Sequence, residues 1–207
     1  MHIRIKEIFD SLFERYPILN HSRGSIYGAY DLLADCYTNG GKVLVCGNGG
    51  SAADALHIVG ELMKSFVLPR KLPPKERVFS NHLNENLQMT LPAISLVNDI
   101  SLMTAYANDN DGDLIFAQQV FGYGKPNDVL FILSTSGNSQ NCLYAAEVAQ
   151  GIGMKVLTLT GESGGRLAPL SDVAVCVQET ETFKIQELHL PVYHAICLAL
   201  EECFFGV

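Results

Sequence analysis

Two short runs rich in glycine and serine carry residue types that suit a phosphate group. The first, GNGGS, covers residues 47–51, and the second, STSGNS, covers residues 134–139. Glycines let the backbone approach an anion closely, and the free N–H groups at the start of a following helix attract negative charge. One such run is often a purely structural turn, whereas two together favour a phosphate ligand. Neither run has the GK[ST] ending or the GxGxxG spacing of nucleotide sites, so no nucleotide cofactor is expected.

A second group of side chains could supply acid–base or metal chemistry. His57 and Glu61 are four residues apart, which places them on one face of a helix. Gln186 and His194 are eight residues apart, two turns along a predicted C-terminal helix. Their nitrogen and oxygen atoms form an acceptable set of ligands for a divalent metal such as zinc. A His–Glu pair at this spacing is more commonly a solvated surface pair, so spacing alone leaves both interpretations open.

The elements that must position these residues follow from alternating apolar runs and helical patterns. Strands are predicted at residues 42–47, 92–97, 128–135, 155–161 and 172–177. Helices are predicted at about residues 2–15, 24–38, 51–66, 99–107, 139–151 and 182–204. Continuous apolar strands that alternate with helices predict an α/β fold: a three-layer, doubly wound parallel sheet of about five strands. Both phosphate runs follow such strands, where open α/β sheets bind their ligands.

The chain reads as one domain over residues 1–207, with two additions to the central sheet. Residues 1–38 form a helical arm before the first strand, and a long helix follows the last strand. Residues 67–91 hold three prolines and several charges without a clear period, so they are predicted to be an insertion. A surface excursion and a lid over the site are equally compatible with this segment.

Composition limits the partners and the compartment. The net charge of −8 argues against electrostatic binding of nucleic acid or an anionic membrane. The six cysteines have no CxxC or zinc-ribbon spacing, and four lie in apolar runs, which favours free thiols in the cytoplasm. The N-terminus is a charged amphipathic pattern unlike a signal peptide, and no apolar stretch is expected to span a membrane. A charged fraction of only 17% suggests that some surface is covered in a homo-oligomer.

Three runs together carry a resemblance to a known family: VLVCGNGGSAADALHIVGEL, STSGNSQN and IQELHLPVYH. The chain resembles sugar isomerase (SIS) domain proteins, and among them the phosphoheptose isomerases, which interconvert sedoheptulose 7-phosphate and a heptose 7-phosphate. The resemblance implies that the hydroxyl groups of the two runs contact the phosphate, from Ser51, Ser134, Thr135, Ser136 and Ser139. It implies that Asn48, Gly49 and Gly50 line the same site.

The resemblance also assigns roles to the ionisable group. It implies an active site, and in several family members a zinc site, at His57, Glu61, Gln186 and His194, with Gln186 also contacting the substrate. Asp109 matches an acidic active-site position. Aldose–ketose isomerisation needs a base, which suits Glu61, and a proton shuttle, which suits His194. Zinc would polarise the carbonyl group. The family is typically homotetrameric, with active sites shared between subunits.

Two other functions remain compatible with the residues. Some SIS relatives bind the bacterial replication initiator and have no isomerase activity, having lost the carboxylate and the C-terminal histidine. Here Glu61 and His194 are both present, which favours the enzyme. An isomerase of another sugar phosphate is the third possibility, because the 67–91 segment is longer than is usual in phosphoheptose isomerases.

Overall fold

The computed structural model describes residues 3–206, and its centre is one parallel sheet of five strands. The strands are β1 (Val43–Gly47), β2 (Ala93–Ser95), β3 (Val129–Leu133), β4 (Lys155–Thr160) and β5 (Val173–Cys176). Their order across the sheet is β2-β1-β3-β4-β5, and every pair is parallel. The predicted α/β class and the five predicted strands are confirmed.

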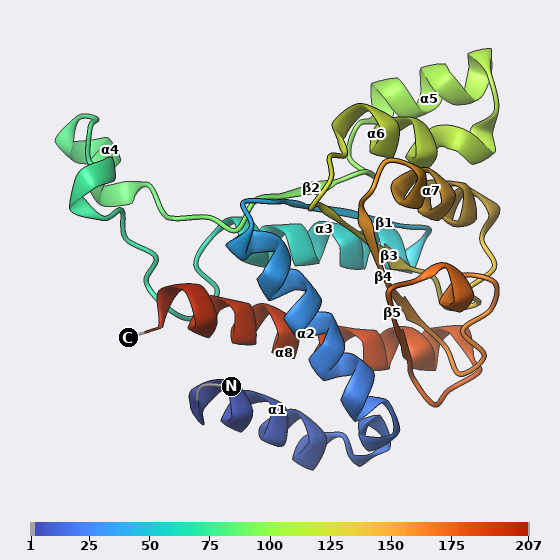
Figure 1. Ribbon diagram of the computed structural model, residues 1–207, viewed down its shortest axis with the longest axis horizontal. Coiled ribbons are helices and arrows are strands. Elements are labelled where there is room, and N and C mark those ends of the chain that lie inside the picture. The colour runs from blue at the N-terminus through green and yellow to red at the C-terminus, as the bar shows by residue number, and fades with distance from the viewer. Residues whose placement is uncertain (1–2, 207) are drawn as a thin grey trace.

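Helices cover both faces of this sheet (Figure 1). The main helices are α1 (Ile3–Arg15), α2 (Arg23–Thr38), α3 (Gly50–Met63), α5 (Ile100–Asp109), α6 (Ile115–Tyr123), α7 (Gln140–Gly151) and α8 (Thr182–Phe205). Side chains in β1 alternate between the faces, as the pleat requires. Val43 and Val45 join a core with α1, α2, α3 and α8, while Leu44 and Cys46 join a second core with α6 and α7. The sheet is therefore doubly wound.

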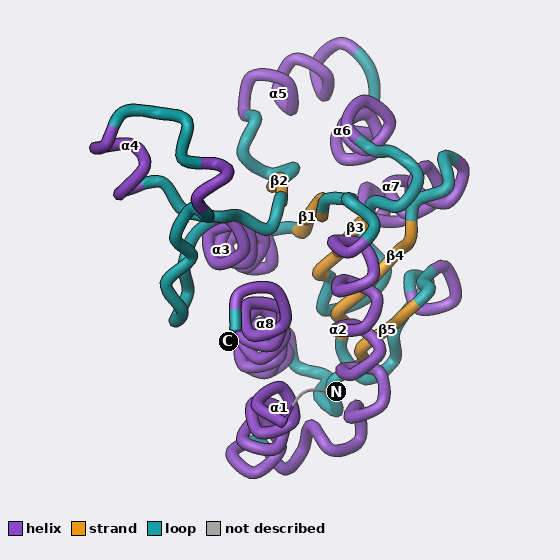
Figure 2. The backbone as a smooth tube through the Cα atoms, turned by 60° about the vertical axis from the view of Figure 1, so that its left-hand side comes forward, coloured by secondary structure: helices purple, strands orange, loops and turns teal. Residues whose placement is uncertain are grey.

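The N-terminal helices, which were predicted to form an arm before the first strand, pack into the larger core. α2 packs on β5 and β3, and α1 packs on α8 as an outer layer (Figure 2). Phe9 and Leu12 of α1 are fully buried. The predicted start of this helix at residue 2 lies outside the described residues.

The C-terminal helix α8 is the element that ties the outer layer to the sheet. It continues through Pro191, and its apolar side chains Val192, Ala199 and Leu200 are fully buried. Among the described residues, it is the one helix with the length and composition of a membrane span. The expectation that no apolar stretch reaches this length was therefore too strict. Its burial between α1 and the sheet is typical of a core helix.

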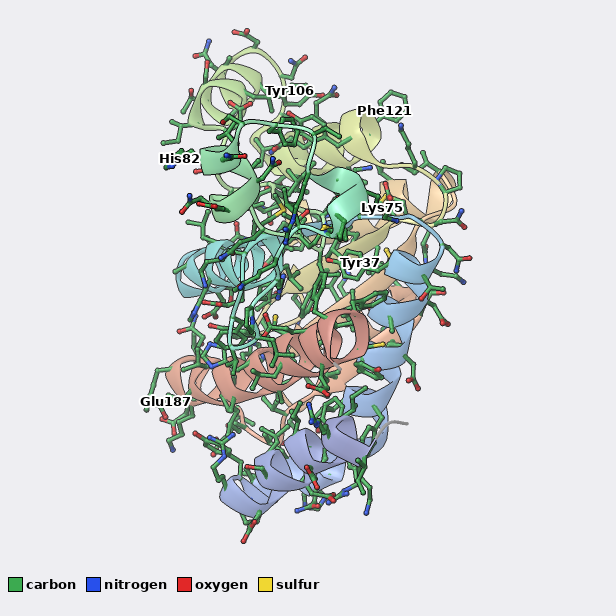
Figure 3. All side chains as sticks on the ribbon, turned by 90° about the vertical axis from the view of Figure 1, so that its left-hand side faces the viewer. Tyr37, Lys75, His82, Tyr106, Phe121 and Glu187 are labelled. Carbon is green, nitrogen blue, oxygen red and sulfur yellow. The ribbon has the colours of Figure 1, made fainter. Side chains whose placement is uncertain are left out.

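Residues 67–91 project from the body on one side (Figure 1). They contain one helical turn at Pro74–Glu76 and the short helix α4 (Asn81–Asn86). Figure 3 looks straight onto this projection, which carries Lys75 and His82. Val78 and Phe79 are exposed there. The tip of the segment thus lies apart from the core, whereas Arg70 and Leu91 near its two ends are buried.

Candidate active site

The two phosphate runs meet where the strand order reverses. The chain passes from β1 to its neighbour β2, and then β3 is added on the other side of β1. Gly47 pairs in register with Leu133, so the loops that follow β1 and β3 begin side by side. This reversal point is the usual ligand position in open α/β sheets. A hollow of about 280 Å³ lies there, lined by residues 48–51, 133–135 and 139 with Thr182 and Gln186.

The first loop turns from strand to helix with little room to spare. A side chain at Gly47 would come within 2.7 Å of the Ser51 carbonyl oxygen and 2.9 Å of the Leu133 carbonyl oxygen. Gly49 has a φ of 58°, and α3 begins at the next residue. Ser51 is buried at the start of α3. Residues 48–51 line the hollow at the start of α3, although the N–H groups of Ser51 and Ala52 already donate to the Asn48 and Gly49 carbonyl oxygens, each over 3.1 Å.

The second loop packs closely against another glycine-rich turn, which contains Gly164 and Gly165. Gly137 has a φ of 64°, and a Cβ there would lie 2.2 Å from the Gly164 carbonyl oxygen. Ser134 and Ser139 lie with their hydroxyl oxygens 3.2 Å apart on the hollow. Ser136 differs from them: its hydroxyl oxygen accepts the Asn138 N–H, and it lines an adjoining hollow of about 480 Å³. Only Thr135 borders both hollows.

A pair of amides joins the two loops. Asn48 Nδ2 donates to Asn141 Oδ1 over 2.9 Å, and Asn141 Nδ2 donates back to Asn48 Oδ1 over 3.0 Å. Asn141 lies two residues after the second run and closes the STSGNSQN motif, but no role was predicted for it from the sequence. The reciprocal pairing fixes the spacing between the loops, which the ligand must match.

The ionisable side chains of α3 and α8 form a cluster of their own. The Nε2 atoms of His57 and His194 lie 3.4 Å apart, and His57 Nε2 lies 3.4 Å from Glu61 Oε1. The other Glu61 oxygen accepts a hydrogen bond from Lys64 Nζ over 2.9 Å. Burial, helped by the nearby His57 ring, lowers the pKa of His194. A neutral imidazole next to a carboxylate can both accept and donate protons.

Two side chains behind this cluster were missed from the sequence. The Tyr193 hydroxyl lies 3.1 Å from Asp54 Oδ1 and 3.1 Å from His57 Nδ1. A carboxylate only accepts, so the hydroxyl donates to Asp54 and accepts from the His57 Nδ1–H. His57 Nε2, the other ring nitrogen, faces Glu61 and His194. Burial raises the pKa of Tyr193, which keeps its hydroxyl protonated. The i, i+3 spacing of Asp54 and His57 was the available signal in the sequence.

The four predicted metal ligands do not all come together. Ligands about 2.0 Å from a tetrahedral zinc lie roughly 3.3 Å apart, which matches the two 3.4 Å spacings around His57. Gln186 lies instead against Gly50 on the phosphate hollow. Within residues 3–206, no group of three or more His, Cys, Asp and Glu side chains is close enough to hold an ion. As they lie, the four residues do not make a complete set of zinc ligands.

Asp109 lies apart from both groups. It is exposed at the end of α5 and accepts a hydrogen bond from Asn108 Nδ2 over 2.8 Å. Figures 1 and 2 both show α5 beside α6 and away from α8. Within one chain the structure does not bring Asp109 to the other predicted site residues.

Comparison with known proteins assigns this arrangement to a family. The SIS domain model matches residues 14–161. A phosphoheptose isomerase of Helicobacter pylori (strain P12) is 43% identical over 173 residues, covering 84% of this chain and 81% of the relative. Another, from Shewanella baltica, is 38% identical over 206 residues, covering 98% and 95%. The chain belongs to the phosphoheptose isomerase family. The resemblance of its motifs to this family is confirmed.

Solved structures of phosphoheptose isomerases share the whole fold. The enzyme from Francisella tularensis superposes with a TM-score of 0.78 at 34% identity, covering 96% of this chain and 97% of that one. The enzyme from Neisseria gonorrhoeae gives a TM-score of 0.76 at 32% identity with the same coverage. The similarity to these phosphoheptose isomerase structures covers nearly the full length of the chain, beyond the residues 14–161 that the SIS domain model matches.

Proposed function

We propose that this isomerase interconverts sedoheptulose 7-phosphate and D-glycero-D-manno-heptose 7-phosphate. The observation that carries the proposal is that α3 and α8 each connect the phosphate hollow to the ionisable cluster. α3 starts at the hollow and carries His57 and Glu61 further along. α8 contributes Gln186 to the hollow and His194 to the cluster. One substrate can therefore meet both groups.

The spacing of the two groups suits a long phosphosugar. From Gly50 to His57 is about 10 Å along the helix axis, because each residue advances the helix by about 1.5 Å. From Gln186 to His194 is about 12 Å by the same measure. A phosphate held in the hollow would place the far end of a seven-carbon chain near the cluster. A triose phosphate would be too short to reach it.

The proposed chemistry uses the cluster residues as acid and base. Glu61 removes a proton from C1 of the ketose to form an enediolate, and the same proton returns to C2 to give the aldose. His194 transfers the hydroxyl proton between O1 and O2. The Tyr193–Asp54 pair holds the His57 ring in one orientation beside them. Phosphate oxygens would accept hydrogen bonds from Ser51, Ser134, Thr135 and Ser139, while Ser136 would act through the backbone turn that its hydroxyl group stabilises.

Zinc, assembly and location complete the proposal. We infer that zinc, if bound, would be held by His57, Glu61, Gln186 and His194, and would polarise the carbonyl group. We infer a cytoplasmic homotetramer of single-domain chains, since Asp109 could reach the site only from a second copy. Elemental analysis of the purified protein tests the metal, and light scattering tests the assembly.

The central experiment is turnover of sedoheptulose 7-phosphate with and without added zinc. We expect aldose formation by the wild-type chain, and a loss of roughly 10²–10⁴-fold in kcat for Glu61→Gln, since that is the range that a general base contributes. Calorimetric titration with the sugar phosphate should show that Glu61→Gln still binds it. Binding without turnover by the wild type would instead favour the non-catalytic alternative. Turnover of a different phosphosugar in place of sedoheptulose 7-phosphate would identify the chain as an isomerase of that sugar.

A further inference from the structure

The projecting segment returns to the body close to where it leaves. The Met89 N–H donates to the Arg70 carbonyl oxygen over 2.7 Å, and Lys71 pairs with Gln88 in an antiparallel bridge. The Leu91 N–H then donates to the Leu62 carbonyl oxygen over 3.0 Å. The two ends of the segment are thus joined at the last turn of α3, while its tip extends away from the body (Figure 1).

A buried arginine lies at this junction. The Arg70 side chain is charged yet only 2% of the residue is exposed. Its Nε donates to Glu201 Oε1 over 2.7 Å, its NH1 to the Leu62 carbonyl oxygen over 2.7 Å, and its NH2 to the Glu61 carbonyl oxygen over 3.1 Å. The flat guanidinium group reaches three acceptors in one plane, which a lysine ammonium group cannot do in the same geometry.

Its partner Glu201, on α8, is equally well satisfied. Oε1 accepts the Phe66 N–H over 2.8 Å as well as Arg70 Nε. Oε2 accepts the N–H groups of Val67 and Leu68 over 2.7 and 2.9 Å. Burial alone would raise the pKa of Glu201, but these hydrogen bonds outweigh it and hold that pKa below its ordinary value. The Glu201 carboxylate is therefore both buried and stabilised in its ionised form.

The location of these contacts connects them to the reaction. A helix ends with carbonyl groups that have no partner within the helix, and a cation there also complements the helix dipole. Arg70 supplies hydrogen-bond donors to the Glu61 and Leu62 carbonyl oxygens in the last turn of α3, and it places a positive charge at that end of the helix. Within residues 3–206, the carboxylate of Glu61 itself contacts only the exposed side chains of Lys64 and His57 as polar partners.

We propose that the buried Arg70–Glu201 pair is a positioning device for Glu61, fixing the last turn of α3 against α8, the helix that carries His194. This inference rests on the proposed function, in which Glu61 is the base. Displacing a catalytic group by about 1 Å can cost roughly 100-fold in rate. Loss of the pair should accordingly lower kcat and leave KM almost unchanged, because the phosphate loops lie at the other end of α3.

The test compares Arg70→Met and Arg70→Lys with a matched control. Lys42→Met breaks another ion pair with a buried carboxylate, between Lys42 and Asp128, at the opposite ends of β1 and β3 from the phosphate loops. Kinetics are measured on sedoheptulose 7-phosphate well below each variant's unfolding temperature. We expect kcat to fall roughly 100-fold for Arg70→Met and less for Arg70→Lys, with KM within about threefold of wild type. Lys42→Met should retain the wild-type kcat.

Amide hydrogen exchange separates this inference from the proposed function. The amides of residues 61–64 should exchange faster in Arg70→Lys than in Lys42→Met, whatever the substrate. A wild-type kcat in both Arg70 variants, with unchanged exchange at these amides, would overturn the positioning role. If Arg70→Met does not fold, Arg70→Lys and Glu201→Gln give the same readouts. A wild-type chain inactive on the substrate would count against the proposed function, and the exchange result would then stand alone.

Discussion

The phosphate loops and the ionisable cluster are built in different ways. The loops are held mainly by their backbone, through the register of β1 and β3 and the close contacts of glycines, and the side chains of Ser51 and Ser134 are buried beside them. The cluster is held by side chains that meet from two helices, with His57 and His194 separated by 137 residues. His57 itself keeps 42% of its side chain exposed. A rigid binding end and an adjustable chemical end therefore share α3 and α8, and substitutions should affect folding at one end and rate at the other.

The largest expected effect is on stability at the loop end. Gly47→Ala places a methyl group against the Ser51 and Leu133 carbonyl oxygens, and relieving the contact would require moving the start of α3 or the end of β3. Overpacking of this kind typically costs up to about 3 kcal/mol in unfolding free energy. Denaturant unfolding measures the loss.

Gly122→Ala is the matched control, because a Cβ at Gly122 in α6 meets nothing within 4 Å. It should be neutral or should stabilise the protein by about 0.5–1 kcal/mol, as alanine usually does in a helix. Equal losses in both variants would show that the loop is less tightly packed than its contacts indicate.

The next effect tests the helix that the two ends share. His189 faces the core from α8 and is fully buried. Burial lowers its pKa to about 4, and the backbone of Thr160 opposes this only in part. The unfolded chain takes up a proton near pH 6.5 and the folded chain does not, so folding stability falls as the pH drops from about 6.5 towards 4. At pH 5 the cost is about 2 kcal/mol, from 1.36 kcal/mol per pKa unit.

The variant His189→Leu should lose less stability on acidification than the wild type does. Thermal unfolding at pH 7 and pH 5 measures this, and the difference between the two proteins should widen at the lower pH. His82→Leu, which removes an exposed histidine of α4, should keep the wild-type response. Parallel profiles for wild type and His189→Leu would mean that His189 gains a proton within the folded protein.

Much of the fold followed from local sequence. Each predicted run of six to eight residues contains a strand of three to six residues, because buried parallel strands need apolar runs and helices must cover them. Helix α6 was missed, since Ile115–Tyr123 is short and its apolar residues show little helical periodicity. The projection of residues 67–91 could not be predicted either. Its anchoring depends on Arg70 meeting Glu201, 131 residues away.

The candidate site divides in the same way. The loops were predicted because glycines and hydroxyl groups follow directly after strands. Asn141 and Tyr193 were missed because their roles depend on partners across the fold, Asn48 and Asp54. Gln186 was placed with the histidines by its position on α8, but eight residues of helix turn it by about 80° relative to His194, and it lies on the phosphate hollow.

The smallest expected effect is at the chemical end, and it tests whether the cluster is adjustable. Tyr193→Phe removes the hydroxyl group that joins Asp54 to His57 Nδ1. Without it His57 can rotate or change tautomer, and losses of 10- to 100-fold are typical when the group that orients a functional histidine is removed. Because Glu61 and His194 remain, we expect the lower end, a fall of about tenfold in kcat with KM unchanged. Tyr37→Phe is the control, since the buried Tyr37 hydroxyl finds no hydrogen-bond partner within the described chain. It should leave kcat unaltered.

A double-mutant cycle with Asp54→Asn completes the test. Non-additive losses in kcat indicate one Asp54–Tyr193–His57 unit, whereas additive losses would mean that each residue acts alone and that the cluster is less coupled than its hydrogen bonds suggest.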